Sequence, residues 1–254
     1  MPSVAREMPD RHGFARRPDD WHRHDRSHDL ANVRAWLIAC DRVDSQSTVD
    51  VLTEAERMRS ARLARIADRI NFTVTRAELR RILARELDVE PRATLLVEPL
   101  SGKPRLCASH GRPDIDFSVS HTDGMSVIAL ARRGRVGVDI ERCRAVPEKL
   151  KIAMEVFGGD VARSISAFPE AKRDEAFLRL WTAGEAYVKA IGTGLAIRRE
   201  PIPLRIRPDD AQVEFCPDFA ERDAWRLAFI DVPAGYVCCL AAADLGGMPL
   251  MAIS

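Results

Sequence analysis

The stretch RVGVDIERC, residues 135–143, decides the fold, because it combines the pattern of a buried strand with two acids. Alternate residues of a strand share a face. Asp139 and Glu141 therefore point to one face, and the apolar residues point into a core on the other: Val136, Val138 and Ile140. Two like charges this close raise a pKa unless a cation lies between them. That cation is either Mg²⁺, which prefers oxygen ligands, or the neighbouring Arg142 and Arg144 at a solvated strand end.

The bulk composition indicates an ordinary globular protein. The 254 residues suffice for two halves of roughly 100–120 residues each. Because 39 basic and 38 acidic residues leave a net charge of +1, we expect neither nucleic acid nor a membrane as partner. No two of the six cysteines form a C-x-x-C pair, no secretory signal opens the chain, and no apolar run reaches membrane-spanning length. These features predict a reduced, cytoplasmic protein.

Turn and periodicity signals divide the chain into a tail and two halves. Residues 1–30 have the composition of a disordered or loosely docked tail, residues 31–134 form a first α+β half, and residues 135–254 form a second. Each half is predicted to run from a strand through helices to further strands. The main predicted segments are a strand over 33–40, a helix over 48–69 capped by Thr53 and Glu56, a continuing helix over 71–89, strands within 114–141, and a long helix over 170–192. The helix over 48–69 is predicted to bury an apolar stripe that includes Met58, Ile66 and Ile70, opposite an Arg-rich outer face.

The long helix carries a second set of charged residues. In LRLWTAGEAYVKAIGTG (178–194), Glu185 and Lys189 are four residues apart and share a helix face. They form either an ordinary surface pair or part of a site, since Glu185 lies beside the apolar stripe. Gly184 costs up to about 1 kcal/mol relative to alanine in a helix, which predicts that another part of the chain packs closely against it.

Two shorter motifs offer anion-binding groups. His121 and Ser120 end the alternating stretch FSVSHT, where they bind an anion or merely cap a turn. Lys103 lies in the turn SGKPRL, where it contacts a ligand or is simply solvated. Neither a Walker A motif nor G-x-G-x-x-G occurs, so the nucleotide folds marked by these motifs are disfavoured. Neither serine of FSVSHT lies in a nucleophile elbow.

Together these pieces resemble a known family. In the order GKPRL, FSVSHT, VGVDIER and LRLWTAGEAYVKAIGTGL, the chain is similar to the 4′-phosphopantetheinyl transferases, and closest to their larger, Sfp-type branch. The resemblance covers roughly residues 33–243. It implies a monomeric pseudo-dimer of two similar α+β halves with the active site in the cleft between them. It also implies transfer of 4′-phosphopantetheine from coenzyme A to a serine of an acyl, peptidyl or polyketide carrier protein, with release of adenosine 3′,5′-bisphosphate.

The resemblance also implies roles for individual residues. The Mg²⁺ ligands would be Asp139, Glu141 and Glu185. Glu185 would serve as a metal ligand, as the general base that takes the serine proton, or as both, and Lys189 would neutralise charge at the phosphate under attack. Contacts to coenzyme A would come from a further set: Arg59, Lys103, Ser120, His121 and Lys189. The carrier would dock on a basic, partly apolar surface, for which the Arg-rich segment 57–69 is a candidate.

The chain departs from the family pattern at two positions. Gly184 replaces a usual lysine, and Asn71 replaces a frequent arginine. Both substitutions favour an alternative, a non-catalytic member of the same fold that binds coenzyme A or a carrier protein. A second alternative is an unrelated metal-dependent phosphohydrolase that uses Asp139 and Glu141.

Overall fold

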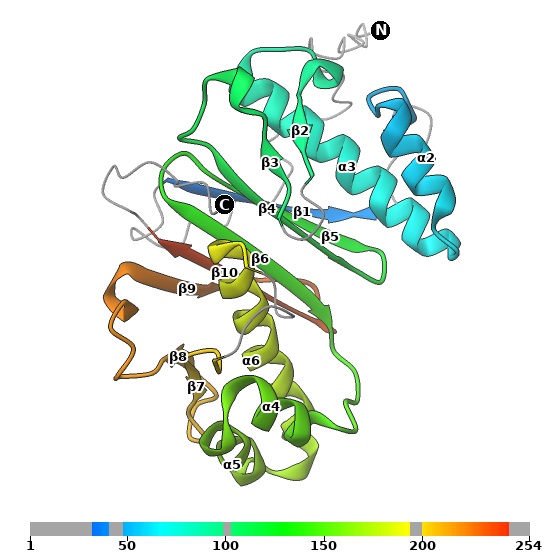
Figure 1. Cartoon of the computed structure of the whole chain (residues 1–254). Coiled ribbons are helices and arrows are strands. Elements are labelled where there is room, and N and C mark those ends of the chain that lie inside the picture. Colours follow the sequence, from blue (N-terminus) through cyan, green and yellow to red (C-terminus); the bar gives the residue numbers. More distant parts are fainter. Residues whose placement is uncertain (1–31, 41–47, 99–102, 194–199, 244–254) are drawn as a thin grey trace, which may run out of the picture.

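The computed structural model describes residues 32–40, 48–98, 103–193 and 200–243; the predicted tail over 1–30 lies outside these residues. The described helices and strands (Figure 1) are β1 (Val33–Ala39), α2 (Glu54–Arg62), α3 (Ile66–Leu87), η4 (Pro91–Ala93), β2 (Leu96–Val97), β3 (Arg105–Leu106), η5 (Ala108–His110), β4 (Asp116–Thr122), β5 (Met125–Ala131), β6 (Arg135–Arg142), α4 (Lys149–Phe157), α5 (Gly159–Ala167), α6 (Glu170–Ile191), β7 (Leu204–Ile206), β8 (Val213–Phe215), η7 (Arg222–Ala224), β9 (Trp225–Phe229) and β10 (Tyr236–Ala243).

The described strands form two larger antiparallel sheets of three strands each. The first has the order β1-β5-β4 and the second the order β6-β10-β9, so the last strand of each half lies in the middle of its sheet. Two short ribbons, β2-β3 and β7-β8, complete the pairing within the described ranges. The protein is therefore a mixed α+β structure, as the sequence predicted.

Three clusters of buried side chains define a helix–sheet–sheet–helix stack. One cluster lies between α3 and the first sheet, and a second lies between the second sheet and the helices α4, α5 and α6. The third lies between the two sheets, and β6 contributes its alternating apolar residues Val136, Val138 and Ile140. The predicted core face of β6 is thus confirmed. Figure 1 shows α3 above the first sheet and α6 below the second.

Glycines mark the reversals between the central strands. Gly124, between β4 and β5, has φ +81°, and Gly134, between β5 and β6, has φ +78°. Residues with a side chain rarely adopt this left-handed backbone conformation, whereas glycine adopts it at little cost. At Gly134 the chain leaves the first sheet and enters the second. The division into two halves at this point stays a prediction.

The N-terminal helices differ from the prediction. Thr53 caps α2 in a capping box with Glu56, as expected, but α2 ends at Arg62 and α3 begins at Ile66. Ile66 is 72% exposed, and two other residues assigned to the apolar stripe, Met58 and Ile70, are exposed as well. The stripe prediction was wrong: Ile66 and Ile70 lie in the first turns of α3, and the residue that α2 buries is the ion-paired Glu56. The Arg80 guanidinium contacts both oxygens of buried Glu56, at 2.8 and 3.0 Å.

The ribbon β7-β8 was not predicted. Each of its strands has only three residues, too few for a period-two pattern to stand out. Among the described helices, none is both long and apolar enough to cross a membrane.

Candidate active site

A glycine brings strand β6 against helix α6. A Cβ atom added at Gly137 would lie 1.9 Å from the carbonyl oxygen of Ala186 and 2.5 Å from the amide nitrogen of Ala190. These contacts are with backbone atoms, so only glycine allows the strand and the helix to approach this closely. Because Glu185 and Lys189 directly precede the two contacted residues, the approach places both beside the acids of β6.

Asp139 is buried, and only one of its two carboxylate oxygens has hydrogen-bond partners among the described residues. Its Oδ1 accepts hydrogen bonds from Ser120 Oγ and Lys189 Nζ, both at 2.7 Å, and Lys189 Nζ also contacts Ser120 Oγ at 3.0 Å. Its Oδ2 is buried and has no hydrogen-bond partner among the described residues. An orphaned carboxylate oxygen is costly, and in a native protein it indicates a missing ligand, ion or water.

The other two acids differ in how they are neutralised. The Glu141 carboxylate pairs with Arg144 at 2.9 Å, so the alternative of arginine neutralisation holds for this acid. Glu185 is half-buried and makes no hydrogen bond to a described residue. Burial raises the pKa of Glu185, and the charges of Asp139 and Glu141 raise it further, against the opposing effect of Lys189. Lys189 bonds to Asp139 instead of Glu185, so the ordinary surface pair does not form.

The residues present match Mg²⁺ in chemistry but are not assembled around it. Within the ranges that the structure covers, no three Asp, Glu, His or Cys side chains converge as metal ligands would. The free Oδ2 of Asp139 and the unbonded carboxylate of Glu185 are nevertheless hard oxygen donors, the type that Mg²⁺ prefers. The donor set therefore fits a hard divalent cation.

His121 lies next to this cluster. It is a residue of β4, directly after Ser120. Desolvation and the charge of Lys189 lower the pKa of His121, while Asp68 and Asp139 oppose the shift. The structure thus brings His121 and Ser120 from the first half near Asp139 and Lys189 of the second half.

Two other predicted ligand contacts lie in separate ion pairs. Arg59 pairs with Glu98 and stacks over the ring of Phe72, with 5.1 Å between the guanidinium carbon and the ring centroid. Lys103 is buried and pairs with Asp116. Their assignment to coenzyme A stays a prediction, and both side chains already have partners in this structure.

Comparison with known proteins agrees with this geometry. Residues 135–241, which include β6 and α6, match the model of the 4′-phosphopantetheinyl transferase superfamily. The chain is 30% identical to slr0495 of Synechocystis sp., provisionally named a 4′-phosphopantetheinyl transferase, over 78% of this chain and 80% of the relative. It is 28% identical to the 4′-phosphopantetheinyl transferase HetI of Nostoc sp., over 85% of this chain and 90% of the relative. The transferase gsp of Aneurinibacillus migulanus is 35% identical over 35% of this chain and 38% of its own length.

The chain belongs to the 4′-phosphopantetheinyl transferase family. Its function is the transfer of 4′-phosphopantetheine to carrier proteins. The resemblance drawn from the four motifs is thereby confirmed.

The position before the transferase's helix glutamate faces the core. A Cβ atom added at Gly184 would lie 2.8 and 2.9 Å from ring atoms of Phe157 and 3.2 Å from Ile202 Cδ1. The predicted close packing at this glycine is confirmed, and the packing partner is Phe157. Phe157 and Ile202 thus occupy the space beside Gly184. Asn71, the second departure, is buried, and its Oδ1 lacks a hydrogen-bond partner among the described residues.

Sequence reasoning missed two residues of the transferase that bind the backbone of β6. Asp116 Oδ2 accepts a hydrogen bond from the Val136 amide at 2.8 Å, and Ser118 Oγ accepts one from the Val138 amide at 3.1 Å. With Ser120 they occupy alternate positions of β4 and share one face. The D-x-S-x-S spacing in DFSVS was the available signal, since polar residues at period two are unusual in a strand between two apolar layers.

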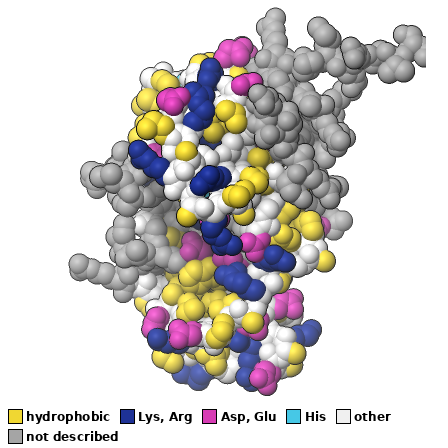
Figure 2. Space-filling view, turned by 90° about the vertical axis from the view of Figure 1, so that its right-hand side faces the viewer, with side chains coloured by type: hydrophobic (Ala, Val, Ile, Leu, Met, Phe, Trp, Pro, Cys, Tyr) yellow, Lys and Arg dark blue, Asp and Glu magenta, His cyan; other side chains and the backbone are white. Residues whose placement is uncertain are grey.

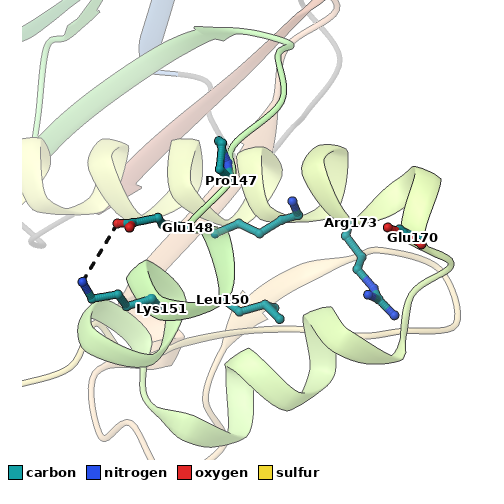
Figure 3. Close-up of a pocket in the computed structure, with 7 residues that line it drawn as sticks. Pro147, Glu148, Leu150, Lys151, Glu170 and Arg173 are labelled. Atoms are coloured by element: carbon teal, nitrogen blue, oxygen red, sulfur yellow. Dashed lines mark ion pairs between the residues drawn. The ribbon is translucent and has the colours of Figure 1, made fainter.

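A polar pocket of the transferase lies away from the acids, at the start of α4 and α6 (Figure 3). It is lined by Pro147, Glu148, Lys149, Leu150, Lys151, Glu170 and Arg173. Arg173 and Glu185 are 12 residues apart on α6, about 18 Å along the helix axis. Lys149 pairs with Asp174 at 2.9 Å, and Arg173 donates to backbone carbonyls. The pocket's cations therefore already have structural partners.

Proposed function

We propose that this transferase moves 4′-phosphopantetheine from coenzyme A to a serine hydroxyl of an apo carrier protein, with Mg²⁺ held by Asp139, Glu141 and Glu185. The observation that carries the metal assignment is the buried, unpartnered Oδ2 of Asp139 beside the unbonded carboxylate of Glu185. When bound, Mg²⁺ supplies positive charge that neutralises the pyrophosphate of coenzyme A. Adenosine 3′,5′-bisphosphate is the leaving group. The activity corresponds to that of a holo-carrier-protein synthase.

Glu185 is the proposed general base. A serine hydroxyl is a weak nucleophile until a base accepts its proton, and a base works best when its pKa lies near the operating pH. In the metal-free protein, burial and the charges of Asp139 and Glu141 raise the pKa of Glu185 against the opposing effect of Lys189. The proton leaves the serine oxygen and binds the Glu185 carboxylate as the serine oxygen bonds to phosphorus and the bond from phosphorus to the leaving phosphate breaks.

Lys189 is the proposed cation at the phosphate under attack. Its ammonium group now contacts Asp139 and Ser120, and its side chain is 27% exposed. A partly exposed lysine can turn toward an incoming phosphate while it keeps one of these contacts. Phosphoryl-type transfer depends mainly on such positioning and charge neutralisation.

Ser120 and His121 are proposed to contact coenzyme A from the opposite half. Both lie at the end of β4, next to Lys189 and Asp139. Protonation of His121 would strengthen its contact with the 3′-phosphate, although its lowered pKa favours the neutral ring at pH 7 in the free enzyme. Arg59 is retained as a proposed phosphate contact at its exposed position on α2.

We also propose that residues 31–134 and 135–254 are the two related halves of a pseudo-dimer. In each described sheet the central strand is the one that comes last in the chain, β5 or β10. The first strand, β1 or β6, lies on one side of it, and β4 or β9 lies on the other. In both halves a 22-residue helix, α3 or α6, follows the first strand of the sheet. The side chains of the candidate site come from both halves, which supports an active site between them.

The carrier protein is proposed to dock on the start of α3 and the segment before it. Ile66 and Ile70 are exposed there and are interspersed with Arg62, Arg65 and Arg69. Figure 2 shows Lys and Arg side chains mixed with hydrophobic ones on the face that includes this region. A basic, partly apolar surface fits a carrier that is acidic around its serine.

The decisive test measures the mass of several apo carrier proteins after incubation with the enzyme, coenzyme A and Mg²⁺. We expect one 4′-phosphopantetheine added to at least one carrier, and about 10²- to 10⁴-fold slower addition with Glu185→Gln. Tight coenzyme A binding with no mass gain on any carrier would instead support the non-catalytic alternative. Equal rates for wild type and Glu185→Gln would contradict the assignment of the base.

A further inference from the structure

Lys103 has all its hydrogen-bonding capacity engaged inside the protein. Its Nζ donates to Asp116 Oδ1 at 2.7 Å, to Asp116 Oδ2 at 2.6 Å and to the carbonyl oxygen of Val136 at 2.6 Å. An ammonium group has three donors, so these three acceptors satisfy it. The side chain is only 7% exposed. Lys103 is therefore a buried, fully bonded cation in this structure.

Asp116 and Lys103 together bind the backbone of one residue of β6, Val136. The Asp116 Oδ2 accepts a hydrogen bond from the amide of Val136 at 2.8 Å. Both backbone polar groups of Val136 are thus bound by the Lys103–Asp116 pair. The amide of Val138 is bound in the same way by Ser118 Oγ of β4.

These contacts occur where β6 has no strand partner. In the described sheet β6 lies at the edge, beside β10 on one side only. Unpaired edge groups that are buried must find other partners. Side chains of the first half supply these partners, so the contacts join the two sheets and fix the position of β6 along β4.

We propose that Lys103 and Asp116 form a positioning clamp that fixes β6, and through it Asp139, and that Lys103 does not bind a phosphate of coenzyme A. Asp139 lies three residues after Val136 on the same strand, and its own Oδ1 is bound by Ser120 of β4. Displacement of β6 along β4 would therefore move the carboxylate. The catalytic consequence rests on the proposed role of Asp139 as a metal ligand.

The energetics of the pair favour the clamp. If Lys103 turned to a phosphate, the Asp116 carboxylate, whose side chain is 12% exposed, would lose its cation. Removing one partner of a buried ion pair is strongly destabilising, because the other charge stays buried without compensation. Burial also lowers the pKa of Lys103, an effect that the charge of Asp116 opposes.

Amine labelling of the wild-type enzyme tests the clamp without any substitution. We expect Lys103 to resist acetylation in the folded protein to the same extent with and without coenzyme A, while exposed Lys172 on α6 reacts readily in both states. Fast labelling of Lys103 in the free enzyme, with protection by coenzyme A, would show that it is a ligand contact and would overturn the proposal.

A double-mutant cycle separates the clamp from a ligand role. We expect Lys103→Met and Asp116→Asn each to raise the unfolding equilibrium constant about 100-fold or more, and the double variant to raise it by much less than the product of the two. For the clamp, both single variants lower kcat about 10-fold and leave the KM for coenzyme A within about two-fold. Lys172→Met is the matched control and changes none of these quantities.

The opposite pattern would refute the clamp. If Lys103 binds phosphate, Lys103→Met raises the KM for coenzyme A about 10-fold, whereas Asp116→Asn changes neither KM nor stability. The stability coupling and the labelling result do not depend on the role of Asp139. If Asp139→Asn retains full activity, the proposed metal site fails, whereas the clamp is still decided by its own measurements.

Discussion

Gly137 makes the strongest steric prediction of the structure. An alanine at this position places its methyl carbon 1.9 Å from the carbonyl oxygen of Ala186 and 2.5 Å from the amide nitrogen of Ala190. A normal contact is about 3.5 Å, so β6 and α6 must separate by well over 1 Å. The clashing atoms belong to the helix backbone, and no rotation of a side chain can relieve the clash.

The loss of stability in Gly137→Ala follows from overpacking of the core. Extra methyl groups in well-packed cores usually cost about 1–3 kcal/mol. Because the contact is with backbone, we expect Gly137→Ala to lie at the upper end, about 3 kcal/mol. That lowers the melting temperature by roughly 6–12 °C for a chain of this size. The same separation moves Asp139 away from Lys189, and a displacement of about 1 Å at a reacting centre can cost about 10²-fold in kcat.

Thermal unfolding and carrier modification measure the two effects. Gly159→Ala, at the start of α5, is a matched control because its Cβ would meet only Arg163 Nη1, at 3.5 Å; it should be neutral or slightly stabilising. Gly184→Ala should fall between the two, since the ring of Phe157 can shift and alanine favours the helix. A Gly137→Ala enzyme with wild-type melting temperature and kcat would refute the close approach of β6 to α6.

The remaining predictions concern charged and polar groups. Because the pKa of Glu185 is raised, its ionised form destabilises the fold at neutral pH; Glu185→Gln should raise the melting temperature at pH 7, with a gain that fades as the pH falls through the raised pKa and vanishes below about 4.5. Ser120→Ala removes a hydrogen bond to the buried Asp139 carboxylate and should lower the unfolding free energy by about 1.5–3 kcal/mol in urea titrations. Burial alone would raise the pKa of Glu56, but the contacts from Arg80 and the Thr53 amide give a net lowering. Glu56→Gln should therefore cost about 3 kcal/mol at pH 7, and its deficit relative to wild type should shrink as the pH falls below 4.5 through the lowered pKa.

Alternation and glycine placement were the most informative sequence signals. The two faces of β6 followed from period-two spacing, and the close packing at Gly184 followed from a glycine where the helix would favour alanine. Both signals are local, because backbone geometry alone determines which residues share a face. The convergence of Asp139 with Lys189 also required the family resemblance, since the two lie 50 residues apart.

Long-range pairing of charges escaped prediction. Arg-rich α2 was read as amphipathic, but Glu56 and Arg80 anchor it, 24 residues apart in the chain. Lys103 resembled a solvated or ligand-binding lysine because sequence spacing cannot reveal that Asp116 lies beside it. Such choices depend on which side chains meet after the sheets pack. A lysine or arginine in the same local motif can therefore either bind a ligand or form an ion pair that stabilises the fold.

The charge balance of the site connects the scaffold to the chemistry. Glu185 is exposed to the negative charges of Asp139 and Glu141, and these two acids contact Lys189 and Arg144, respectively. The third acid, Glu185, has no cation bonded to it among the described residues, and burial together with the charges of Asp139 and Glu141 raises its pKa. The free enzyme thus holds more negative charge than its own cations offset. A divalent cation would correct this imbalance and allow the pyrophosphate to approach acids that would otherwise repel it.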